Sequence, residues 1–481
     1  MNKRSIPRWC RTVLAAWACT GATWAYASQA PLQFEPCRID DIPGAVQCAK
    51  LDVPLAVGDH RQVSVQIVRL PALTRQPAPD PVLLLAGGPG QAASALGRLA
   101  QALGAVRRER DLLLVDQRGT GRSQPLDCKL PADADPLSDL LKDKLLPDEV
   151  LSCFASLREQ AAHYTTHDYI RDLEAVRARL GIEQFNLWGG SYGTRVVQEY
   201  LRLHPERVRT AVMDGVVSST TRLTADIAAN NDARLHAVVV ACQQSSSCHA
   251  AYPKLQQIVE QLPRQLQQKP IAVDLPHPLT GVQLKGQFSD ISLASTLGVM
   301  LYQPEMQALV PRLLYQVSQG EVRPLLAAYS QVMLVLGEQM NDVLYFAVAC
   351  AEDAEVPTLP AAGVFVSVQK MAREVCAAWG LPGKPLPGPV KSNVPTLLLS
   401  GGLDPVTPPR LANQVATGLA NRLHLQAPQL GHVISHYRCV PKVIHEFIQD
   451  AKAGAEAKSC DLKLRAMPAL PFYVTDKEAR P

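Results

Sequence analysis

One serine lies in a turn that only small residues can form. Residues 185–188 are an apolar run typical of a buried strand, residues 189–193 read Gly-Gly-Ser-Tyr-Gly, and residues 194–201 have helical periodicity. In such a strand–turn–helix unit, Gly189 and Gly193 stand where a Cβ would collide with neighbouring backbone, and Ser191 adopts a strained conformation. The five-residue pattern also fits an ordinary turn. Residues elsewhere in the chain must therefore decide its meaning.

A carboxylate and a histidine follow at the positions that would activate this serine. A serine hydroxyl is a weak nucleophile until a histidine takes its proton and a carboxylate orients that histidine. Asp404 follows an apolar strand at 394–400, and His432 follows the next expected strand at 422–426. Loops after consecutive parallel strands lie at the same edge of a sheet. We therefore expect Ser191 as nucleophile, Asp404 as orienting acid and His432 as general base.

Two other residues compete for these roles. His436 lies four residues beyond His432, but a lone loop histidine is also explained as a solvated surface group. Asp214 ends the strand-like run 208–213 and is an alternative acid, although a carboxylate there also serves to cap a turn. The order serine, acid, histidine, with one strand between the last two, favours Asp404 and His432.

A glycine-rich loop predicts the site that stabilises the oxyanion. Residues 87–90 read Gly-Gly-Pro-Gly and follow an apolar strand. Acyl transfer needs two backbone N–H donors, one from the residue after the nucleophile and one from the loop after an early strand. Tyr192 and Gly88 are the candidates, because a residue without Cβ lets its amide approach the substrate closely. A plain turn is the alternative interpretation.

A second charged loop follows the expected strand at 112–115. We expect Asp116 and Arg118 to form a buried ion pair that braces the edge of the sheet, because charged residues at strand ends more often brace loops than take part in catalysis.

Five motifs in this order resemble the prolyl aminopeptidase and tripeptidyl aminopeptidase group of α/β hydrolases. They are LLAGGPGQ at 84–91, DQRGTGRS at 116–123, GGSYGT at 189–194, GGLDPVTP at 401–408 and GH at 431–432. One departure is Ala86, where many relatives carry histidine; this affects a contact behind the oxyanion hole. The resemblance implies an α/β-hydrolase fold, with a mostly parallel central sheet and an inserted helical cap, and a peptide substrate with a free N-terminus.

The motifs divide the chain into four segments. Residues 1–27 are expected to be a signal peptide, 28–217 the N-terminal part of the α/β core, 218–390 a helical cap insertion and 391–481 the C-terminal part of the core, which resembles that of tripeptidyl aminopeptidases. Helical periodicity within the insertion is clearest at 232–241, 255–262 and 305–317. A cap that covers the serine would shape substrate choice.

Two acidic residues in the insertion are candidates for recognising the free amino group of a peptide. Glu352 and Asp353 follow Cys350, and carboxylates in a confined pocket bind an ammonium group through charge-assisted hydrogen bonds. A solvated acidic loop is the alternative.

The N-terminus indicates export, and the charge balance gives no indication of a polyanion-binding face. Lys3, Arg4, Arg8 and Arg11 precede an apolar stretch at 13–24 and the small-residue site Ala25-Tyr26-Ala27, so we expect cleavage before Ser28 and a secreted or periplasmic protein. The apolar stretch is too short for a stable membrane span, and the residues before Cys19 match a lipoprotein signal poorly. Lys and Arg total 48 and Asp and Glu 44, and the excess equals the four basic residues of the signal. The sequence has no block of basic residues of the kind that binds nucleic acid.

Ten cysteines remain after this cleavage, and an even number in an exported protein predicts disulfides. Taken as neighbours in sequence they pair as 37–48, 128–153, 242–248, 350–376 and 439–460. The sequence contains no Cys-x-x-Cys pair, the spacing typical of zinc sites, and no metal or cofactor is expected.

The sequence leaves three functions open. The first is an aminopeptidase acting on peptides, the second a carboxylesterase acting on small acyl esters, and the third a non-catalytic binding protein on a hydrolase scaffold. The presence of all three catalytic residue types argues against the third. The oligomeric state is not determined by these patterns.

Overall fold

Runs of apolar residues form the central sheet. The computed structural model describes residues 32–44, 46–126, 128, 135–142, 148–336, 340–353, 362–381, 383–452 and 454–474, and over these residues one sheet has nine strands in the order β1-β2-β3-β5-β4-β6-β7-β10-β11. The strands are β1 (Glu35–Cys37), β2 (Val46–Pro54), β3 (Gln62–Leu70), β4 (Val82–Leu85), β5 (Leu112–Val115), β6 (Phe185–Gly190), β7 (Val208–Asp214), β10 (Thr396–Gly401) and β11 (Arg422–Ala427).

Six of these strands are mutually parallel, and their register places the carboxyl ends of β6, β7 and β10 next to one another. β5, β4, β6, β7, β10 and β11 run parallel, whereas β1, β2 and β3 are antiparallel to their neighbours. Gly190 pairs with Asp214, which also pairs with Leu399. The residues that follow β6, β7 and β10 therefore emerge side by side at one edge of the sheet.

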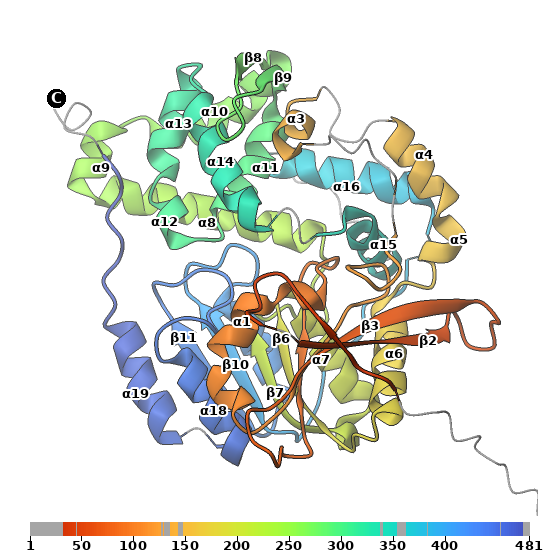
Figure 1. Ribbon diagram of the computed structural model, residues 1–481. Helices are drawn as coiled ribbons and strands as arrows, with labels where there is room; N and C mark the ends of the chain where they lie inside the picture. Colours follow the sequence, from red (N-terminus) through yellow and green to blue (C-terminus); the bar gives the residue numbers. More distant parts are fainter. Residues whose placement is uncertain are drawn as a thin grey trace, which may run out of the picture. The chain divides into compact units, whose positions relative to one another are not determined.

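Each face of the sheet has its own layer of helices (Figure 1). Successive side chains of a strand point to opposite faces. Leu83 and Leu113 point into a core that includes α6 (Thr166–Arg179), α7 (Tyr192–Leu203) and α17 (Pro409–Ala416). Their neighbours Leu84 and Leu114 point into a second core against four helices. These are α1 (Gly97–Ala102), α2 (Gly104–Arg107), α18 (Val440–Asp450) and α19 (Gly454–Arg465). A single-turn helix at Ala93–Ala95 and another at Pro205–Arg207 complete this part.

The segment between β7 and β10 is mostly helical and has a hydrophobic core of its own. Its helices are α8 (Ala225–Gln244), α9 (Ser246–Ala251), α10 (Leu255–Gln268), α11 (Asp290–Met300), α12 (Pro304–Gln307), α13 (Val310–Ser318), α14 (Arg323–Leu336), α15 (Asp342–Glu352) and α16 (Val366–Trp379). It also contains the hairpin β8 (Ile271–Pro276) and β9 (Gln283–Phe288), which helical periodicity did not indicate. The helix expected at 305–317 is broken into α12 and α13.

Part of this inserted segment packs on the α/β core rather than on its own core. Leu344 and Val348 of α15 and Trp379 of α16 belong to the same buried cluster as the strands and α6. The ring of Trp379 stacks on Phe154 of α4 (Asp148–Ser156), with ring centroids 4.8 Å apart. Conversely, α3 (Pro136–Leu140), which comes before the insertion in sequence, packs with the insertion's core. A short α5 (Arg158–Ala161) follows α4. The boundaries at 218 and 390 stay a prediction.

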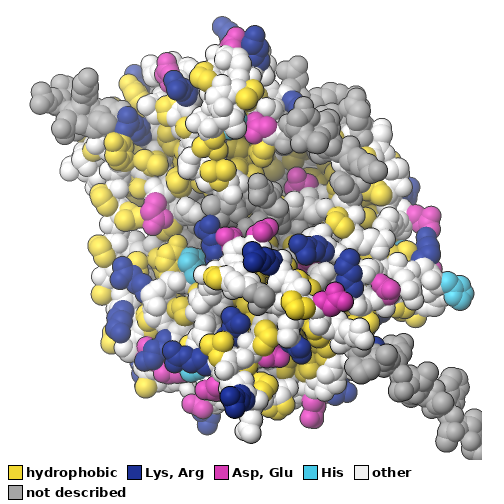
Figure 2. All heavy atoms as spheres, in the orientation of Figure 1, with side chains coloured by type: hydrophobic (Ala, Val, Ile, Leu, Met, Phe, Trp, Pro, Cys, Tyr) yellow, Lys and Arg dark blue, Asp and Glu magenta, His cyan; other side chains and the backbone are white. Residues whose placement is uncertain are grey.

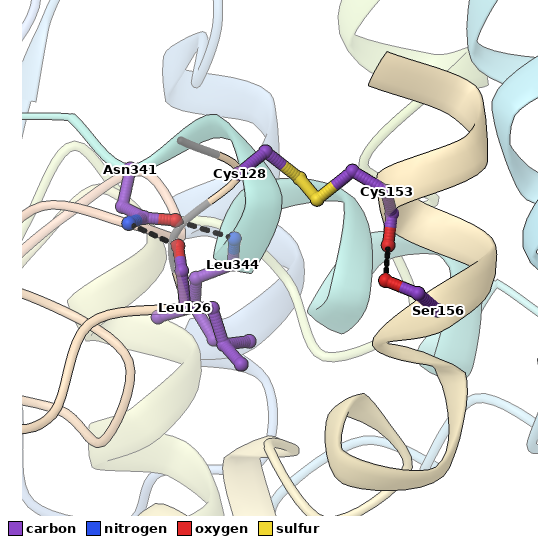
Figure 3. Close-up of a disulfide and its surroundings, with 6 residues drawn as sticks. All are labelled: Leu126, Cys128, Cys153, Ser156, Asn341 and Leu344. Atoms are coloured by element: carbon purple, nitrogen blue, oxygen red, sulfur yellow. Dashed lines mark hydrogen bonds between the residues drawn. A yellow bond between two sulfur atoms is a disulfide. The ribbon is translucent and has the colours of Figure 1, made fainter. Parts of the chain in front are cut away.

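All five expected disulfides are present, at Cys37–Cys48, Cys128–Cys153, Cys242–Cys248, Cys350–Cys376 and Cys439–Cys460. Figure 3 shows the disulfide Cys128–Cys153 near Asn341, the residue that caps α15. The Asn341 side chain accepts a hydrogen bond from Leu344 N at 2.8 Å, which caps α15, and donates to the Leu126 carbonyl at 2.8 Å. The loop after β5 is thus tied to α15 by Asn341 and to α4 by Cys128.

The expected signal peptide at 1–27 lies outside the described residues. Within them, no helix combines the length and the hydropathy needed to cross a membrane. On the face shown in Figure 2, acidic and basic side chains are interspersed over the surface.

The expected ion pair between Asp116 and Arg118 is wrong. Arg118 pairs with Asp172 of α6, with N–O distances of 2.7 and 2.5 Å, and neither side chain is exposed. Asp116 instead accepts hydrogen bonds from Ser94 N and Arg122 N at 2.7 and 3.2 Å. The bracing role holds for Arg118, which also donates to the Leu55 carbonyl at 2.7 Å. In the folded chain Arg118 therefore pairs with Asp172, 54 residues away, and not with Asp116, which is two residues away.

We expect Arg118→Met to lower the free energy of unfolding by about 3–5 kcal/mol, because the buried Asp172 carboxylate would lose its partner. Urea unfolding at pH 7 measures this change. Arg465→Met is the matched control, since Arg465 also pairs with an aspartate, Asp461 at 2.7 Å, but is 58% exposed and should matter little. Equal effects of the two substitutions would contradict the prediction.

Candidate active site

Ser191 lies between the end of β6 and the start of α7, in a backbone conformation that few residues adopt. Its φ is 53°, in the region that L-residues normally avoid. A Cβ on Gly189 would lie 2.4 Å from the Gly193 carbonyl oxygen, and one on Gly193 would lie 2.3 Å from the Leu85 carbonyl oxygen. The turn therefore needs glycine at both positions, as the sequence predicted. It presses the start of α7 against the end of β4.

His432 and Asp404 are hydrogen-bonded to each other. Nδ1 of His432 lies 2.8 Å from Oδ2 of Asp404, whose side chain is fully buried. Thr407 completes the arrangement. Its N–H donates to Asp404 Oδ1 at 2.7 Å, and its hydroxyl donates to Asp404 Oδ2 at 2.6 Å. Asp404 is thus held in position by the loop that it begins.

Burial and charge oppose each other in setting the pKa values of this pair. Burial acts to raise the pKa of Asp404, but the nearby His432 and the hydrogen bonds from His432 and Thr407 lower it below its usual value. Burial acts to lower the pKa of His432, but the charges of Asp404 and Asp214 and the hydrogen bond to Asp404 raise it above its usual value. The carboxylate is therefore ionised, and the imidazolium form of His432 is stabilised.

The histidine ring lies beside the strand end that holds the serine. A Cβ on Gly215 would lie 3.1 Å from Cε1 of His432, and the preceding residue, Asp214, accepts a hydrogen bond from Ser191 N at 2.9 Å through its carbonyl. Among the described residues, the Ser191 hydroxyl has no hydrogen-bond partner, so its bond to His432 is not formed here. Such bonds are often long before substrate binds.

The glycine loop offers two backbone donors next to the serine. A Cβ on Gly87 would lie 3.2 Å from Cβ of Ser191, and Gly88 has φ of 101°. Gly87 N donates to the Gln91 side chain at 3.1 Å. By contrast, the N–H groups of Gly88 and Tyr192 have no acceptor within the part of the chain that the structure describes. These are the two donors that the sequence predicted for an oxyanion.

The inserted segment reaches the base and the glycine loop directly. Tyr302 accepts a hydrogen bond from His432 N through its carbonyl at 3.1 Å, and the two rings are edge to face with centroids 5.0 Å apart. Asn341 N donates to the Gly90 carbonyl at 2.9 Å. Sequence reasoning missed Tyr302 and Asn341, and no local pattern marks them. It also missed Thr407, which the Asp-Pro-Val-Thr motif could have indicated.

Glu352 and Asp353 are engaged within the protein rather than in a solvated loop. Glu352 accepts a hydrogen bond from Thr166 N at 2.8 Å and pairs with Arg195 at 3.3 Å, and its side chain is 15% exposed. Asp353 is buried and accepts hydrogen bonds from Leu223 N and Thr224 N at 3.3 and 3.1 Å. The alternative of a solvated acidic loop is therefore wrong. A role in binding an amino group stays a prediction.

The two competing residues do not take the expected acid and base positions. Asp214 is buried and its carboxylate accepts hydrogen bonds from Ile434 N and Ser435 N at 2.9 and 2.6 Å. Burial raises the pKa of Asp214 to about 6. His436 is exposed, and its ring centroid lies 4.1 Å from that of Tyr437. It is His432 that contacts Asp404. Among the described residues, no group of three or more His, Cys, Asp or Glu side chains is placed to hold a metal ion.

A strained serine after β6, a buried aspartate after β10 and a histidine after β11 are the features that α/β hydrolases share. Residues 80–438 match the model of the alpha/beta hydrolase fold family, which is more than half of the chain. The chain belongs to this family.

The chain is matched in part by curated relatives, among them an aminopeptidase and a serine protease. It is 30% identical over 213 residues to a tripeptidyl aminopeptidase of Streptomyces coelicolor, covering 40% of this chain and 39% of that protein. It is 32% identical over 210 residues to the serine protease Hip1 of Mycobacterium tuberculosis, covering 39% and 40%. The matches thus span about two fifths of the relatives' length. A solved proline iminopeptidase of Mycobacterium smegmatis has 15% identity and a TM-score of 0.43, covering 84% of this chain and 98% of that one.

We expect Asp404→Asn to lower the pKa of His432, because the neutral amide removes the largest of the effects that oppose burial. A pH titration of the His432 Cε1–H resonance by NMR, assigned by its loss in His432→Gln, measures this shift. In the wild type the midpoint should lie above 6.5, the ordinary value for histidine. Asp232→Asn is the control, since Asp232 is a carboxylate of the insertion that accepts a bond from Val364 N at 2.9 Å. An unchanged midpoint in Asp404→Asn would contradict the expectation.

Proposed function

We propose that this protein is an exported serine hydrolase, an aminopeptidase that releases N-terminal residues or short peptides through an acyl-enzyme on Ser191. The observation that carries the proposal is the 2.8 Å hydrogen bond between His432 and a buried, ionised Asp404, at the sheet edge where Ser191 is held with φ of 53°. These are the nucleophile, base and orienting acid of acyl transfer.

In the proposed mechanism each residue has a defined role. Nε2 of His432 takes the proton of the Ser191 hydroxyl as the oxygen attacks the carbonyl carbon, and the oxyanion accepts hydrogen bonds from Gly88 N and Tyr192 N. His432 then gives the proton to the leaving nitrogen, and the C–N bond breaks. Water then attacks the ester carbon and gives a proton to His432. The bond between that carbon and Ser191 Oγ breaks, Oγ takes the proton back from His432, and the acid product leaves. Asp404 stays ionised throughout and stabilises the imidazolium.

A peptide with a free N-terminus is the proposed substrate. Two observations support it: the related proteins are named tripeptidyl aminopeptidase and serine protease, and acidic side chains lie in the insertion near the start of α7. Glu352 and Asp353 are the proposed ligands of the substrate ammonium group. Export is supported by the five disulfides and by the N-terminal sequence.

We expect a fluorophosphonate probe to label the wild-type protein and not Ser191→Ala, since the probe captures an activated serine. The measurement is in-gel fluorescence of folded protein at a pH above the titration midpoint of His432, where the imidazole can accept the serine proton. Ser94→Ala, at a serine bonded to Asp116, should label like the wild type. A folded wild-type protein that does not react would overturn the proposal and favour the non-catalytic binding protein.

Rates on three substrates then separate a peptidase from an esterase. Aminoacyl or tripeptidyl arylamides, their N-blocked forms and short acyl esters would be compared. The proposal expects the free-amine arylamides to have the highest kcat/KM. A preference for N-blocked substrates or short esters would instead make the protein a carboxylesterase.

We expect Glu352→Gln to raise KM for free-amine arylamides by roughly tenfold or more, with a much smaller effect on N-blocked esters, because a charge-assisted hydrogen bond to the ammonium group is lost. Steady-state kinetics on both substrates measure this. Glu199→Gln is the matched control, since Glu199 of α7 is also a buried glutamate paired with an arginine, Arg202 at 3.0 Å. Equal effects on both substrates would contradict a role in binding the amino group.

A further inference from the structure

In the loop that carries His432, the residue after the histidine has an unfavourable backbone conformation. Val433 has φ of 60°. A β-branched residue rarely adopts this region, because its branched Cβ crowds the neighbouring carbonyl groups. Strain of this kind persists only where the surroundings enforce it. Some contact must therefore hold residues 432–435 in place.

Asp214 supplies that contact from the end of β7. Its carboxylate accepts hydrogen bonds from Ile434 N at 2.9 Å and Ser435 N at 2.6 Å, the two residues that follow Val433. The Ser435 hydroxyl in turn accepts a hydrogen bond from Nε1 of Trp188, a buried residue of β6, at 2.9 Å. Asp214, Ser435 and Trp188 are all buried, so water does not compete for these bonds.

The same residue also contacts the serine. The Asp214 carbonyl accepts the hydrogen bond from Ser191 N at 2.9 Å, while its carboxylate holds the loop of His432. One residue at the end of β7 thus joins the nucleophile, on one side, to the base, on the other. Gly215 follows it with φ of 66°, and a Cβ there would lie 3.1 Å from the His432 ring.

We propose that Asp214 is the positioning residue of the general base: its carboxylate holds the strained turn at Val433 and so sets where His432 lies relative to Ser191. This inference rests on the proposed function, because it gives Asp214 a role only if His432 acts as base. The Asp214 carboxylate bonds to backbone N–H groups of the loop, and it differs in this from Asp404, which bonds to the imidazole itself.

The carboxylate acts in two ways that an amide would not reproduce. The two oxygens of the carboxylate accept hydrogen bonds from two N–H groups. The amide of an asparagine has one oxygen and would turn its NH2 group toward one of those donors. The negative charge also lies close enough to His432 to raise its pKa. The groups that face His432 are Asp404 and Asp214, which are acidic, and the ring of Tyr302, which packs against it from the insertion.

The pH dependence of fluorophosphonate labelling by Asp214→Asn tests the proposal. Labelling requires neutral His432, so it rises with pH through the pKa of that residue. Removing the charge of Asp214 lowers this pKa, and the rise should therefore move to lower pH. Displacing the base should also lower the maximal labelling rate, by between about 10-fold and 100-fold.

A second substitution, Val433→Gly, separates positioning from general stability. Glycine adopts positive φ without strain, so Asp214→Asn/Val433→Gly should recover part of the labelling rate that Asp214→Asn loses. If Asp214→Asn does not fold, the double variant is expected to fold and label. Failure of the double variant to fold would contradict the proposal, because the carboxylate would then be supporting more than this turn.

The matched control is Asp116→Asn. Asp116 is a buried carboxylate that also accepts from two backbone N–H groups at the end of a strand, but in a loop that does not carry the base. It should lower stability and leave the pH profile unchanged. The proposal is overturned if Asp214→Asn labels like an active wild type, or if its rate falls with an unshifted profile and without recovery by Val433→Gly. An unreactive wild type would instead refute the proposed function itself.

Discussion

The turn between β6 and α7 can form only because backbone packs against backbone at two glycines. A Cβ on Gly193 would lie 2.3 Å from the carbonyl oxygen of Leu85, and a Cβ on Gly189 would lie 2.4 Å from that of Gly193. This approach brings the start of α7 against the end of β4. The glycine loop after β4 therefore meets Ser191. The N–H groups of Gly88 and Tyr192, which have no acceptor among the described residues, belong to the two segments that the contact joins.

The rest of the proposed site depends on buried carboxylates that hold loops at the same edge of the sheet. Asp404 holds its own loop through Thr407 and orients His432, and Asp214 holds the loop that follows His432. Each carboxylate is desolvated, and each is compensated by hydrogen bonds from backbone or side-chain donors. This compensation exceeds the cost of burial for Asp404, whose pKa is lowered, and offsets it only in part for Asp214, whose pKa is raised to about 6. In both cases the donors become rigidly placed. The inserted segment adds its own contact through Tyr302, so the position of the base depends on the inserted segment as well as on the sheet.

Local pattern predicted the elements that carry their own signal. Apolar runs located β5, β6, β10 and β11, and the small residues around Ser191 predicted the strained turn, because the steric demands of that turn act on adjacent residues. The pairing of cysteines close in sequence was also right. Patterns failed where the partner was distant. Arg118 pairs with Asp172 and not with Asp116, because burial on α6 offered a bidentate partner that no spacing reveals. The contact of Tyr302 with His432 was missed for the same reason. The hairpin β8–β9 was missed although its strands are neighbours in the sequence, with Pro276 paired to Gln283.

The sequence by itself determined which residue types stand at the ends of the parallel strands, and with them the serine, acid and histidine order of the fold family. It could do so because each strand end is a local event that glycine, proline and apolar runs mark. Only the tertiary structure decided which carboxylate contacts the imidazole. Asp214 ends β7 and Asp404 lies in the loop after β10, but Asp404 contacts Nδ1 of His432, while Asp214 contacts the backbone beyond it. That difference is set by strand order and by the path of the histidine loop across two neighbouring strand ends, which depend on packing over the whole chain.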